Sequence, residues 1–278
     1  MSTCAISVGI ADVYSDPDAT SERVTQALLN MSVTAGATFG EWTQVTLSDY
    51  EGWIRTDELA DPIVKGFCKV GEHCTTPLDL VAVVVVPHTL LYADSMGMEM
   101  LDHAYLSTAL PLLDTTGAVR LQVALPGERM AWIARDAVSI RRLSAMYPRT
   151  PISTITSYAR AFVGVPYLWG GTSSQGIDCS GFVQLCYRMG GYILPRDADQ
   201  QHDALSHSVQ REEIQEGDLI FFGRSAITHV AMALNNKEYI HAEGQEYNRV
   251  IINSFDPVDS HYDERLSTIV RAIKRVVV

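Results

Sequence analysis

The sequence lacks any hydrophobic stretch long enough to cross a membrane. Its longest apolar run, Leu80 to Val86, has seven residues and stops at Pro87, whereas a spanning helix needs about 20 residues. The N-terminus also lacks the basic start and the apolar core of a secretory signal. We therefore expect a cytoplasmic protein with no membrane partner.

Basic side chains are also scarce. The 278 residues include 21 Lys and Arg against 33 Asp and Glu, which gives a formal net charge of −12. No run of Lys or Arg forms a positive stripe, and binding to a nucleic-acid backbone needs one. Nucleic acid is therefore not an expected partner.

The cysteines do not suggest a disulfide framework or a metal centre. There are five, an odd number in a chain large enough to bury a core. Cys68, His73 and Cys74 lie close together, but a tetrahedral zinc site needs four ligands and no second pair with suitable spacing follows. We predict no metal and no cofactor.

The first 143 residues consist of short apolar segments separated by turn residues, a pattern that indicates strands. They also repeat. Tyr14 is followed 39 residues later by Trp53, and Tyr92 is followed 40 residues later by Trp132. Two copies about 78 residues apart predict tandem small β-barrels.

Each copy ends in a Trp-Ile strand and a short polar turn, in YEGWIRTDEL and in ERMAWIARDAV. These segments resemble the last strands of bacterial SH3-like (SH3b) domains. We expect Trp53 and Trp132 to pack in the cores, since tryptophan is mostly buried.

The periodicity changes after a proline-punctuated connector. Ile155, Tyr158, Ala159, Phe162 and Val163 follow helical spacing, and we expect Ser153 to cap this helix and Gly164 to end it.

A second helical stripe runs from Phe182 to Met189 and stops at Gly190-Gly191. From Asp218 onward the pattern is that of strands. A helical part followed by an antiparallel sheet predicts an α+β domain.

Cys179 stands at the first turn of the second helix. Unpaired backbone N–H groups and the helix dipole favour a thiolate there, and the thiolate is the nucleophilic form. Cys186 lies inside the apolar face of the same helix, where it is most simply a small core residue.

His229 and His241 lie on two successive predicted strands. If residues 235–237 form a three-residue hairpin loop, Leu234 pairs with Glu238 and the two histidines project from the same face. A two-residue loop would place them on opposite faces. With the three-residue loop, Cys179, His229 and His241 form a nucleophile, base and orienting group. The alternative is that each histidine is simply packed or exposed.

Several motifs together resemble the NlpC-type papain-like cell-wall cysteine peptidases. They are GVPYLWGGTSSQGIDCSGFVQ, LPRD, EGDLIFF, THVAMAL and YIHAEG, in the order and spacing of that family. The resemblance covers roughly residues 151 to 278. Tandem SH3b domains ahead of such a domain resemble the γ-D-glutamyl-L-diamino acid peptidases of the dipeptidyl-peptidase VI type.

The resemblance implies roles for individual residues. Cys179 would be the nucleophile, His229 the general base and His241 the orienting residue, while the hydroxyl of Tyr167 would help to bind the oxyanion. Four further residues would contact substrate: Asp178 its amine, Ser180 and Arg196 its D-glutamate carboxylate, and Tyr50 its N-terminal amine. Acidic residues near Asp16 would assist Tyr50.

The residues by themselves leave other interpretations open. Asp178 is equally a helix cap, and Tyr167 and Trp169 are equally core residues beside a turn. Arg196 and Asp197 are equally a solvated ion pair, and Tyr50 an exposed turn residue.

At position 198, many relatives with this architecture have a serine, whereas this chain has Ala198. The missing hydroxyl would leave more of the carboxylate contact to Ser180 and Arg196.

The sequence thus predicts two small all-β SH3-like barrels followed by an α+β papain-like peptidase domain. The expected segments are SH3b domain 1 (1–66), SH3b domain 2 (67–143), a linker (144–152) and the peptidase domain (153–278). The expected reaction is hydrolysis of the γ-D-glutamyl-L-diamino acid bond of murein stem peptides that carry a free N-terminal L-alanine, by a monomer and through a thioester. The alternatives are an endopeptidase acting on intact peptidoglycan, a non-catalytic wall-binding module, and acyl transfer to an amine.

Overall fold

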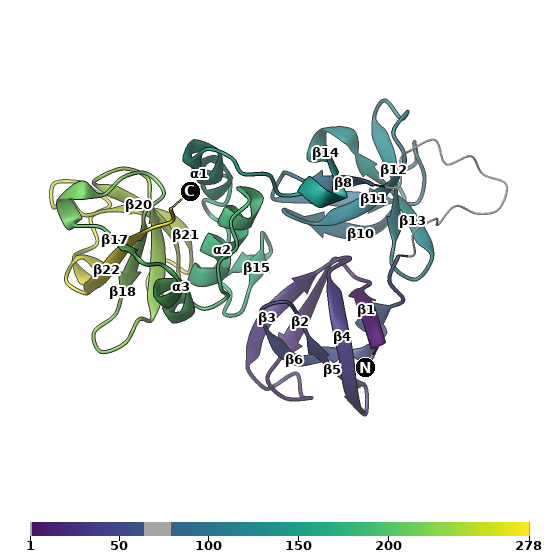
Figure 1. The fold of residues 1–278 in the computed structure, drawn as a ribbon, viewed down its shortest axis with the longest axis horizontal. Coiled ribbons are helices and arrows are strands. Elements are labelled where there is room, and N and C mark those ends of the chain that lie inside the picture. The colour runs from purple at the N-terminus through teal and green to yellow at the C-terminus, as the bar shows by residue number, and fades with distance from the viewer. Residues whose placement is uncertain (1, 64–78, 278) are drawn as a thin grey trace. The chain divides into compact units, whose positions relative to one another are not determined.

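The computed structural model describes residues 2–63 and 79–277. The chain divides into two compact units, Met1–Met146 and Tyr147–Val278, and each is described by itself (Figure 1). The division falls inside the segment 144–152 that is predicted to be a linker. Cys68, His73, Cys74 and the predicted boundary between residues 66 and 67 lie outside the described residues.

The N-terminal unit contains two seven-stranded antiparallel sheets. The first has the order β3-β2-β6-β5-β4-β1-β7, and the second has the corresponding order β10-β9-β13-β12-β11-β8-β14. The strands of the first sheet are β1 (Ser2–Ile6), β2 (Ile10–Tyr14), β3 (Arg23–Leu28), β4 (Ser32–Phe39), β5 (Trp42–Thr46), β6 (Glu51–Arg55) and β7 (Leu59–Ala60). Those of the second are β8 (Leu80–Val84), β9 (His88–Tyr92), β10 (Met100–Tyr105), β11 (Ala109–Asp114), β12 (Arg120–Leu125), β13 (Arg129–Ala134) and β14 (Val138–Arg142).

The sequence repeat corresponds to equivalent strand pairings. Tyr14 of β2 pairs with Trp53 of β6, and Tyr92 of β9 pairs with Trp132 of β13. Each Trp-Ile strand also leads into a short 3-10 turn, η1 (Thr56–Glu58) or η2 (Arg135–Ala137). The two copies in the sequence therefore have the same local architecture.

The expectation that the two tryptophans form the cores is wrong. Trp53 and Trp132 are only half-buried, whereas their neighbours Ile54 and Ile133 are fully buried in the two core clusters. Successive side chains of a strand point to opposite faces, so the isoleucine enters the core and the tryptophan faces the other way.

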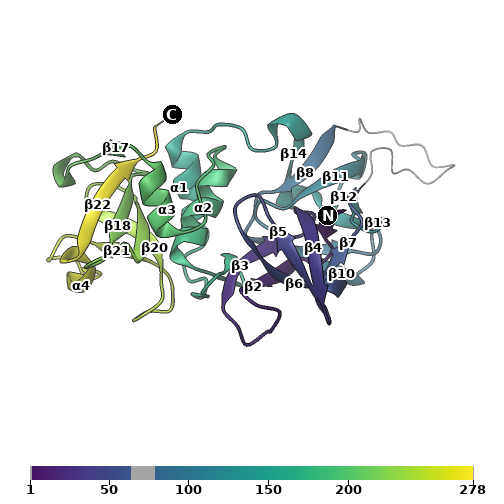
Figure 2. The ribbon, with the colours of Figure 1, turned by 60° about the horizontal axis from the view of Figure 1, so that its bottom comes forward.

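The C-terminal unit places helices beside one antiparallel sheet, as predicted. Figures 1 and 2 show α1, α2 and α3 together on one side of the strands. The sheet has the order β17-β22-β18-β19-β20-β21. The helices and strands of the unit are α1 (Ile152–Arg160), β15 (Thr172–Ser173), β16 (Gly176–Ile177), α2 (Cys179–Met189), α3 (Ala198–Ala204), β17 (His207–Ser208), β18 (Leu219–Phe222), β19 (His229–Ala233), β20 (Glu238–Glu243), β21 (Arg249–Ser254), α4 (Glu264–Ser267) and β22 (Val270–Arg275).

Helix α1 differs from its predicted ends. It begins at Ile152 behind Pro151, so Ser153 lies inside the first turn and does not cap the helix. It ends at Arg160, and Gly164, with φ of +90°, closes the turn that follows. Because the helix stops early, Val163 is 52% exposed instead of buried.

Helix α2 matches its prediction and is buried on nearly every side. It begins at Cys179, ends at Met189 and is followed by Gly190. Its closest sheet neighbours are β19 and β20. Cys186 is fully buried in it, which confirms that this cysteine is a core residue.

The hairpin between β19 and β20 has the predicted register. Met232 pairs with Ile240 and Ala233 with Tyr239, and the Leu234 N–H donates to the Glu238 carbonyl over 2.8 Å. The loop therefore has three residues, as assumed in the prediction that places His229 and His241 on one face.

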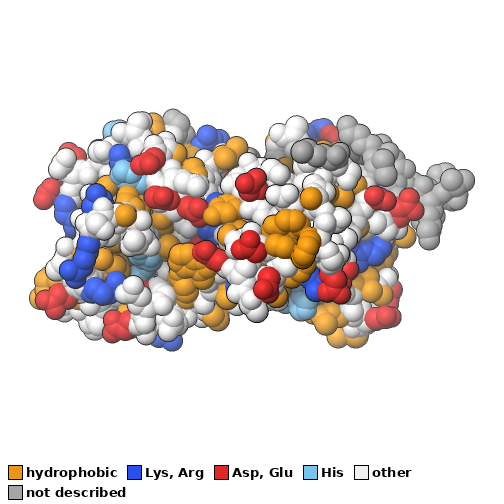
Figure 3. All heavy atoms as spheres, turned by 90° about the horizontal axis from the view of Figure 1, so that it is seen from below, with side chains coloured by type: hydrophobic (Ala, Val, Ile, Leu, Met, Phe, Trp, Pro, Cys, Tyr) orange, Lys and Arg blue, Asp and Glu red, His pale blue; other side chains and the backbone are white. Residues whose placement is uncertain are grey.

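The surface agrees with the composition. On the face drawn in Figure 3, Lys and Arg side chains are interspersed with acidic ones and form no continuous stripe. None of the helices within residues 2–63 and 79–277 has the length and apolarity that a membrane crossing requires.

Candidate active site

Cys179 is the first residue of α2, and the residue before it caps this helix. Asp178 is the N-cap, and its Oδ1 accepts the Gly181 N–H over 2.7 Å. The Cys179 side chain is 8% exposed. The backbone N–H of Val230 donates a hydrogen bond to the Cys179 sulfur, so Cys179 lies beside the start of β19.

His229 and His241 are joined by a hydrogen bond. Nε2 of His229 lies 2.8 Å from Nδ1 of His241, and the ring centroids are 5.0 Å apart. His241 is fully buried, whereas His229, at the start of β19, is partly exposed. The predicted meeting of the two imidazoles on one face is confirmed.

Asn253 of β21 extends this pair and was not predicted. Its Oδ1 lies 2.9 Å from Nε2 of His241, and its Nδ2 donates to the His261 carbonyl over 2.9 Å. It is fully buried. In the sequence, Asn253 stands within an ordinary strand pattern, and only its register opposite β20 brings it to His241.

These contacts determine which ring nitrogens carry protons. Because the His261 carbonyl can only accept, the Asn253 amide must point its NH2 there and its oxygen toward His241. His241 then carries its proton on Nε2, and its Nδ1 accepts from Nε2–H of His229. Nδ1 of neutral His229 is consequently left without a proton, as a base requires.

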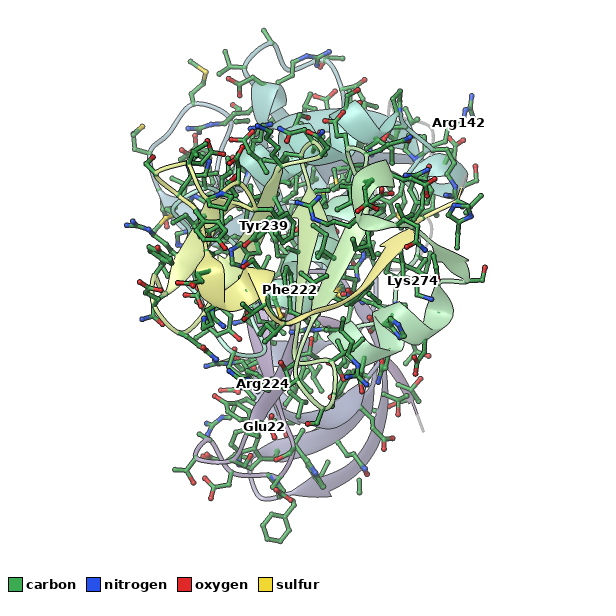
Figure 4. The ribbon with its side chains drawn as sticks, turned by 90° about the vertical axis from the view of Figure 1, so that its left-hand side faces the viewer. Glu22, Arg142, Phe222, Arg224, Tyr239 and Lys274 are labelled. Carbon is green, nitrogen blue, oxygen red and sulfur yellow. The ribbon has the colours of Figure 1, made fainter. Side chains whose placement is uncertain are left out.

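Aromatic rings surround the two imidazoles. Phe222 of β18, which pairs with His229, has its ring 5.6 Å from that imidazole. Tyr239 of β20 lies 5.3 Å from His241 and 5.8 Å from Phe222. Figure 4 labels Phe222 and Tyr239 on their strands. The rings exclude water from the buried side of the pair.

Burial shifts the pKa values of the sulfur and of the imidazoles away from the charged forms. Burial, with a smaller contribution from the Asp178 charge, raises the pKa of Cys179 to about 12. Burial, then His241 and Arg265, holds the pKa of His229 well below 6.5. Both shifts favour the neutral thiol and the neutral imidazole over their charged forms, and so oppose the thiolate that the helix start favours.

Asp178 is a cap and also one half of a buried ion pair. Arg196, 2% exposed, donates to it over 2.6 and 3.0 Å, and Arg196 also donates to Ser180 Oγ over 3.0 Å. The Gly170 N–H and the Ser180 hydroxyl complete its contacts. The cap interpretation is confirmed, and the interpretation of Arg196 with Asp197 as a solvated pair is wrong.

The residues of this network, Asp178, Ser180 and Arg196, are those to which the resemblance assigns contacts with the substrate. Although burial lowers the pKa of Arg196, the charge and hydrogen bonds of Asp178 raise it above its ordinary value. The carboxylate of Asp178 already accepts from five donors, more than its usual four sites. Its predicted contact with a substrate amine would add to a saturated group, and that role stays a prediction, as do those of Ser180 and Arg196.

Tyr167 lies next to the start of α2. Its backbone is bridged to Ile177, two residues before Cys179, and its N–H donates to the Asn248 carbonyl over 2.9 Å. Burial raises the pKa of Tyr167, and the charges of Cys179 and Asp178 raise it further. The phenol therefore stays protonated, able to donate a hydrogen bond, and within electrostatic reach of the sulfur. Trp169 nearby is 60% exposed and is not a core residue.

The remaining predicted residues are placed as follows. Ala198 is nearly buried at the first position of α3. Tyr50 and Asp16 belong to the N-terminal unit. Tyr50 is half-buried against the first core, so it is not the exposed turn residue of the alternative interpretation. Asp16 is exposed, and its Oδ2 accepts from the Ser15 hydroxyl over 3.1 Å.

No group of three or more His, Cys, Asp or Glu side chains suited to a metal occurs within residues 2–63 and 79–277.

Known proteins resemble both parts of the chain. The NlpC/P60 family model matches residues 164–271, and the model of the bacterial dipeptidyl-peptidase SH3 domain matches residues 13–59. The second β-sheet shares the strand order of the first, which supports a second SH3-like domain as a proposal.

Two curated relatives match most of the chain. A γ-D-glutamyl-L-lysine dipeptidyl-peptidase of Bacillus cereus is 31% identical over 242 residues, 82% of this chain and 69% of the relative. One of Bacillus subtilis with the same name is 29% identical over 233 residues, 78% of this chain and 71% of the relative. A crystal structure of an NlpC/P60 family protein from Bacillus cereus superposes with a TM-score of 0.83 over 99% of both chains, at 24% identity, which supports the fold.

Proposed function

This chain belongs to the NlpC/P60 family of cysteine peptidases, and we propose that it hydrolyses the γ-D-glutamyl bond to a diamino acid in murein stem peptides with a free N-terminal L-alanine. The observation that carries the proposal is the chain of hydrogen bonds from His229 through His241 to Asn253 beside Cys179. The names of the two Bacillus relatives support the choice of substrate.

In the proposed mechanism, the reaction begins with a proton transfer. Nδ1 of His229 takes the Cys179 proton, and the sulfur attacks the γ-carbonyl carbon of the D-glutamyl residue. The imidazolium of His229 that forms lies next to His241, and its Nε2–H donates a hydrogen bond to Nδ1 of His241. Because the sulfur is buried and the imidazole is only partly exposed, each charge of the ion pair compensates the other, which a single charge there would lack.

The first tetrahedral intermediate then collapses to a thioester, which water hydrolyses in a second step. The oxyanion accepts a hydrogen bond from the Tyr167 hydroxyl, whose raised pKa keeps its proton in place. His229 gives its proton to the departing amine of the diamino acid, and a thioester remains on Cys179. Water attacks the thioester with His229 as base, which releases L-alanyl-γ-D-glutamate and restores the thiol.

The buried Asp178–Arg196–Ser180 group would contribute specificity. Arg196 keeps a positive charge within the buried network, and Ser180 accepts one of its hydrogen bonds. A substrate carboxylate arriving here would face an arginine and a hydroxyl that are already oriented. Ala198 offers no hydroxyl for the same contact.

The test uses synthetic peptides and the full chain. L-Ala-γ-D-Glu-L-Lys and the matching diaminopimelate peptide are incubated with enzyme, and products are identified by mass spectrometry. We expect the dipeptide L-Ala-γ-D-Glu and the free diamino acid, with no product from Cys179→Ala and near wild-type rates from Cys186→Ser.

Blocked substrates discriminate the alternatives. N-acetylated peptide, muramyl-linked peptide and intact peptidoglycan are assayed in parallel, with Tyr50→Ala as the variant for recognition of the amine. Cleavage of free and blocked peptides at similar kcat/KM would contradict the dipeptidyl-peptidase proposal in favour of an endopeptidase. Absence of cleavage of every substrate by wild type would favour a binding module.

A further inference from the structure

Glu243 is a buried carboxylate that the proposed mechanism does not use. It ends β20, and its side chain is 3% exposed. Its oxygens accept the backbone N–H groups of Gln245, Glu246 and Tyr247 over 2.7 to 3.0 Å. Arg265 of α4 donates to it over 3.1 Å. One carboxylate thus fixes the whole turn that follows β20.

That turn contacts Tyr167 in two ways. Gly244 lies against the phenol ring so closely that a Cβ built on it would stand 2.6 Å from Cε1 and 2.7 Å from Cζ of Tyr167. At the other end of the turn, Asn248, with φ of +50°, presents its carbonyl to the Tyr167 N–H over 2.9 Å. The ring and the backbone of Tyr167 are therefore both fixed by residues 244–248.

We propose that Glu243 and Gly244 are positioning residues for Tyr167: the carboxylate holds the turn, and the missing side chain at position 244 leaves the space that the phenol ring occupies. The proposal rests on the proposed function, since it concerns the placement of the oxyanion donor. A donor displaced by about 1 Å loses much of its effect on the transition state, because hydrogen-bond strength depends steeply on geometry.

Glu243 also balances charge near the imidazoles. The charged groups that face His241 are Glu243 of its own strand and Asp263 and Arg265 from the α4 segment, while His229 and Cys179 complete the site. Arg265 lowers the pKa of both histidines, and Glu243 raises that of His241. Loss of the Glu243 charge leaves Arg265 less compensated, so the pKa of His241 falls further.

The first experiment is a double-mutant cycle on kcat. Tyr167→Phe removes only the hydroxyl, and Gly244→Ala adds only the Cβ that meets the ring. We expect Gly244→Ala alone to lower kcat roughly 10- to 100-fold with little change in KM. In the Tyr167→Phe background, where no hydroxyl remains to misplace, the same change should cost less than about 3-fold.

The second experiment uses Glu243→Gln with Glu246→Gln as its matched control. Both variants convert a carboxylate to an amide in the same turn, but Glu246 is exposed and contributes a backbone N–H to Glu243. We expect Glu243→Gln to lower kcat with little change in KM, and Glu246→Gln to leave both unchanged. A purely structural role of Glu243 would lower the melting temperature and leave kcat, measured well below that temperature, at the wild-type value.

The outcomes separate the two proposals. Full additivity of Gly244→Ala and Tyr167→Phe, or a wild-type kcat in Glu243→Gln, overturns the positioning role while the proposed reaction stands. A Tyr167→Phe enzyme with wild-type kcat removes Tyr167 from the reaction and overturns both this inference and the oxyanion step. Failure of wild type to cleave any peptide overturns the proposed function itself.

Discussion

The molecule contains two histidine pairs with the same contact and different surroundings. In the N-terminal unit, Nε2 of His88 lies 2.7 Å from Nδ1 of His103, and in the C-terminal unit the corresponding atoms of His229 and His241 are 2.8 Å apart. Both pairs lie on neighbouring antiparallel strands, β9 with β10 and β19 with β20.

The two pairs differ at their outer ring nitrogens, those that do not join the two imidazoles to each other. His88 is exposed, and among the described residues neither outer nitrogen of that pair has a further hydrogen-bond partner. The second pair ends in a buried asparagine and begins beside the cysteine that opens α2. A contact between two imidazoles is therefore not sufficient for a catalytic site. The tautomer fixed by Asn253 and the nearby thiol distinguish the second pair, for which we propose the catalytic role.

The largest expected effect comes from removing the thiol. Cys179→Ser should lower kcat on the order of 10⁴-fold or more, because the nucleophile and its base act as a unit. The fold should persist, with a melting temperature close to wild type, since the change is small. Circular dichroism and steady-state kinetics check both expectations. A Cys179→Ser enzyme that retains a tenth of the wild-type rate would show that the sulfur is not the attacking atom.

The next effect distinguishes the two histidine pairs directly. His229→Gln should lower kcat roughly 10²- to 10⁴-fold, the usual contribution of a general base. His88→Gln removes the equivalent imidazole from the other pair and should leave kcat unchanged. The two variants are compared on the same substrate at the same pH. Equal losses of kcat in both variants would contradict a functional difference between the two histidine pairs.

A smaller effect is expected at the buried end of the catalytic pair. Asn253→Ala should lower kcat about 10- to 100-fold with KM little changed, because His241 loses the acceptor that sets its tautomer. It should also destabilise the fold by about 1 to 3 kcal/mol, since buried polar groups are left unpaired. Asn236→Ala, in the exposed hairpin loop, is the control. Kinetics well below the melting temperature keep the two effects apart.

The residues of the site differ in how far the sequence predicts them. Cys179 follows from its place before an apolar helical stripe, and the two histidines from strand parity with a three-residue loop. Asn253 could not be found this way, because its role depends on the register of β20 with β21, which pairs Tyr239 with Asn253. The partner of Arg196 was also missed, since Asp178 lies 18 positions earlier in the sequence and only the fold brings the two together.

The helices and strands also differ in how far the sequence predicts them. Strands and helices with strong apolar periodicity, such as α2 and β18, were predicted. Helices α3 and α4 were not, because segments such as ADQQHDA are short and polar and have no apolar stripe. The face on which a strand places each side chain is also set by the sheet, which explains why Ile54 and not Trp53 forms the core.

The pH dependence of the reaction should follow from the burial of His229. His229 is active as a base when neutral, so activity is present above its pKa and is lost as pH falls through it. Because burial holds that pKa well below 6.5, we expect the acid limb of kcat/KM to lie below pH 6.5. Burial raises the pKa of Cys179 to about 12, so no second limb is expected between pH 7 and 10. A bell-shaped profile with a descending limb near pH 8 would show that a thiolate–imidazolium pair already exists at rest.

The smallest expected effect is that of metal removal. In the catalytic pair, three of the four ring nitrogens are engaged, two with each other and one with Asn253, so only Nδ1 of His229 is available to a ligand. A single imidazole nitrogen does not make a zinc site, which needs three or four protein ligands. The exposed pair has its outer nitrogens available, but it holds no thiol and is not expected to affect the reaction. Dialysis against EDTA should therefore leave kcat within error of the untreated enzyme, both in wild type and in His88→Gln. If chelation abolished activity and added zinc restored it in wild type but not in His88→Gln, the exposed pair would be the one required, and the assignment of the two pairs would be reversed.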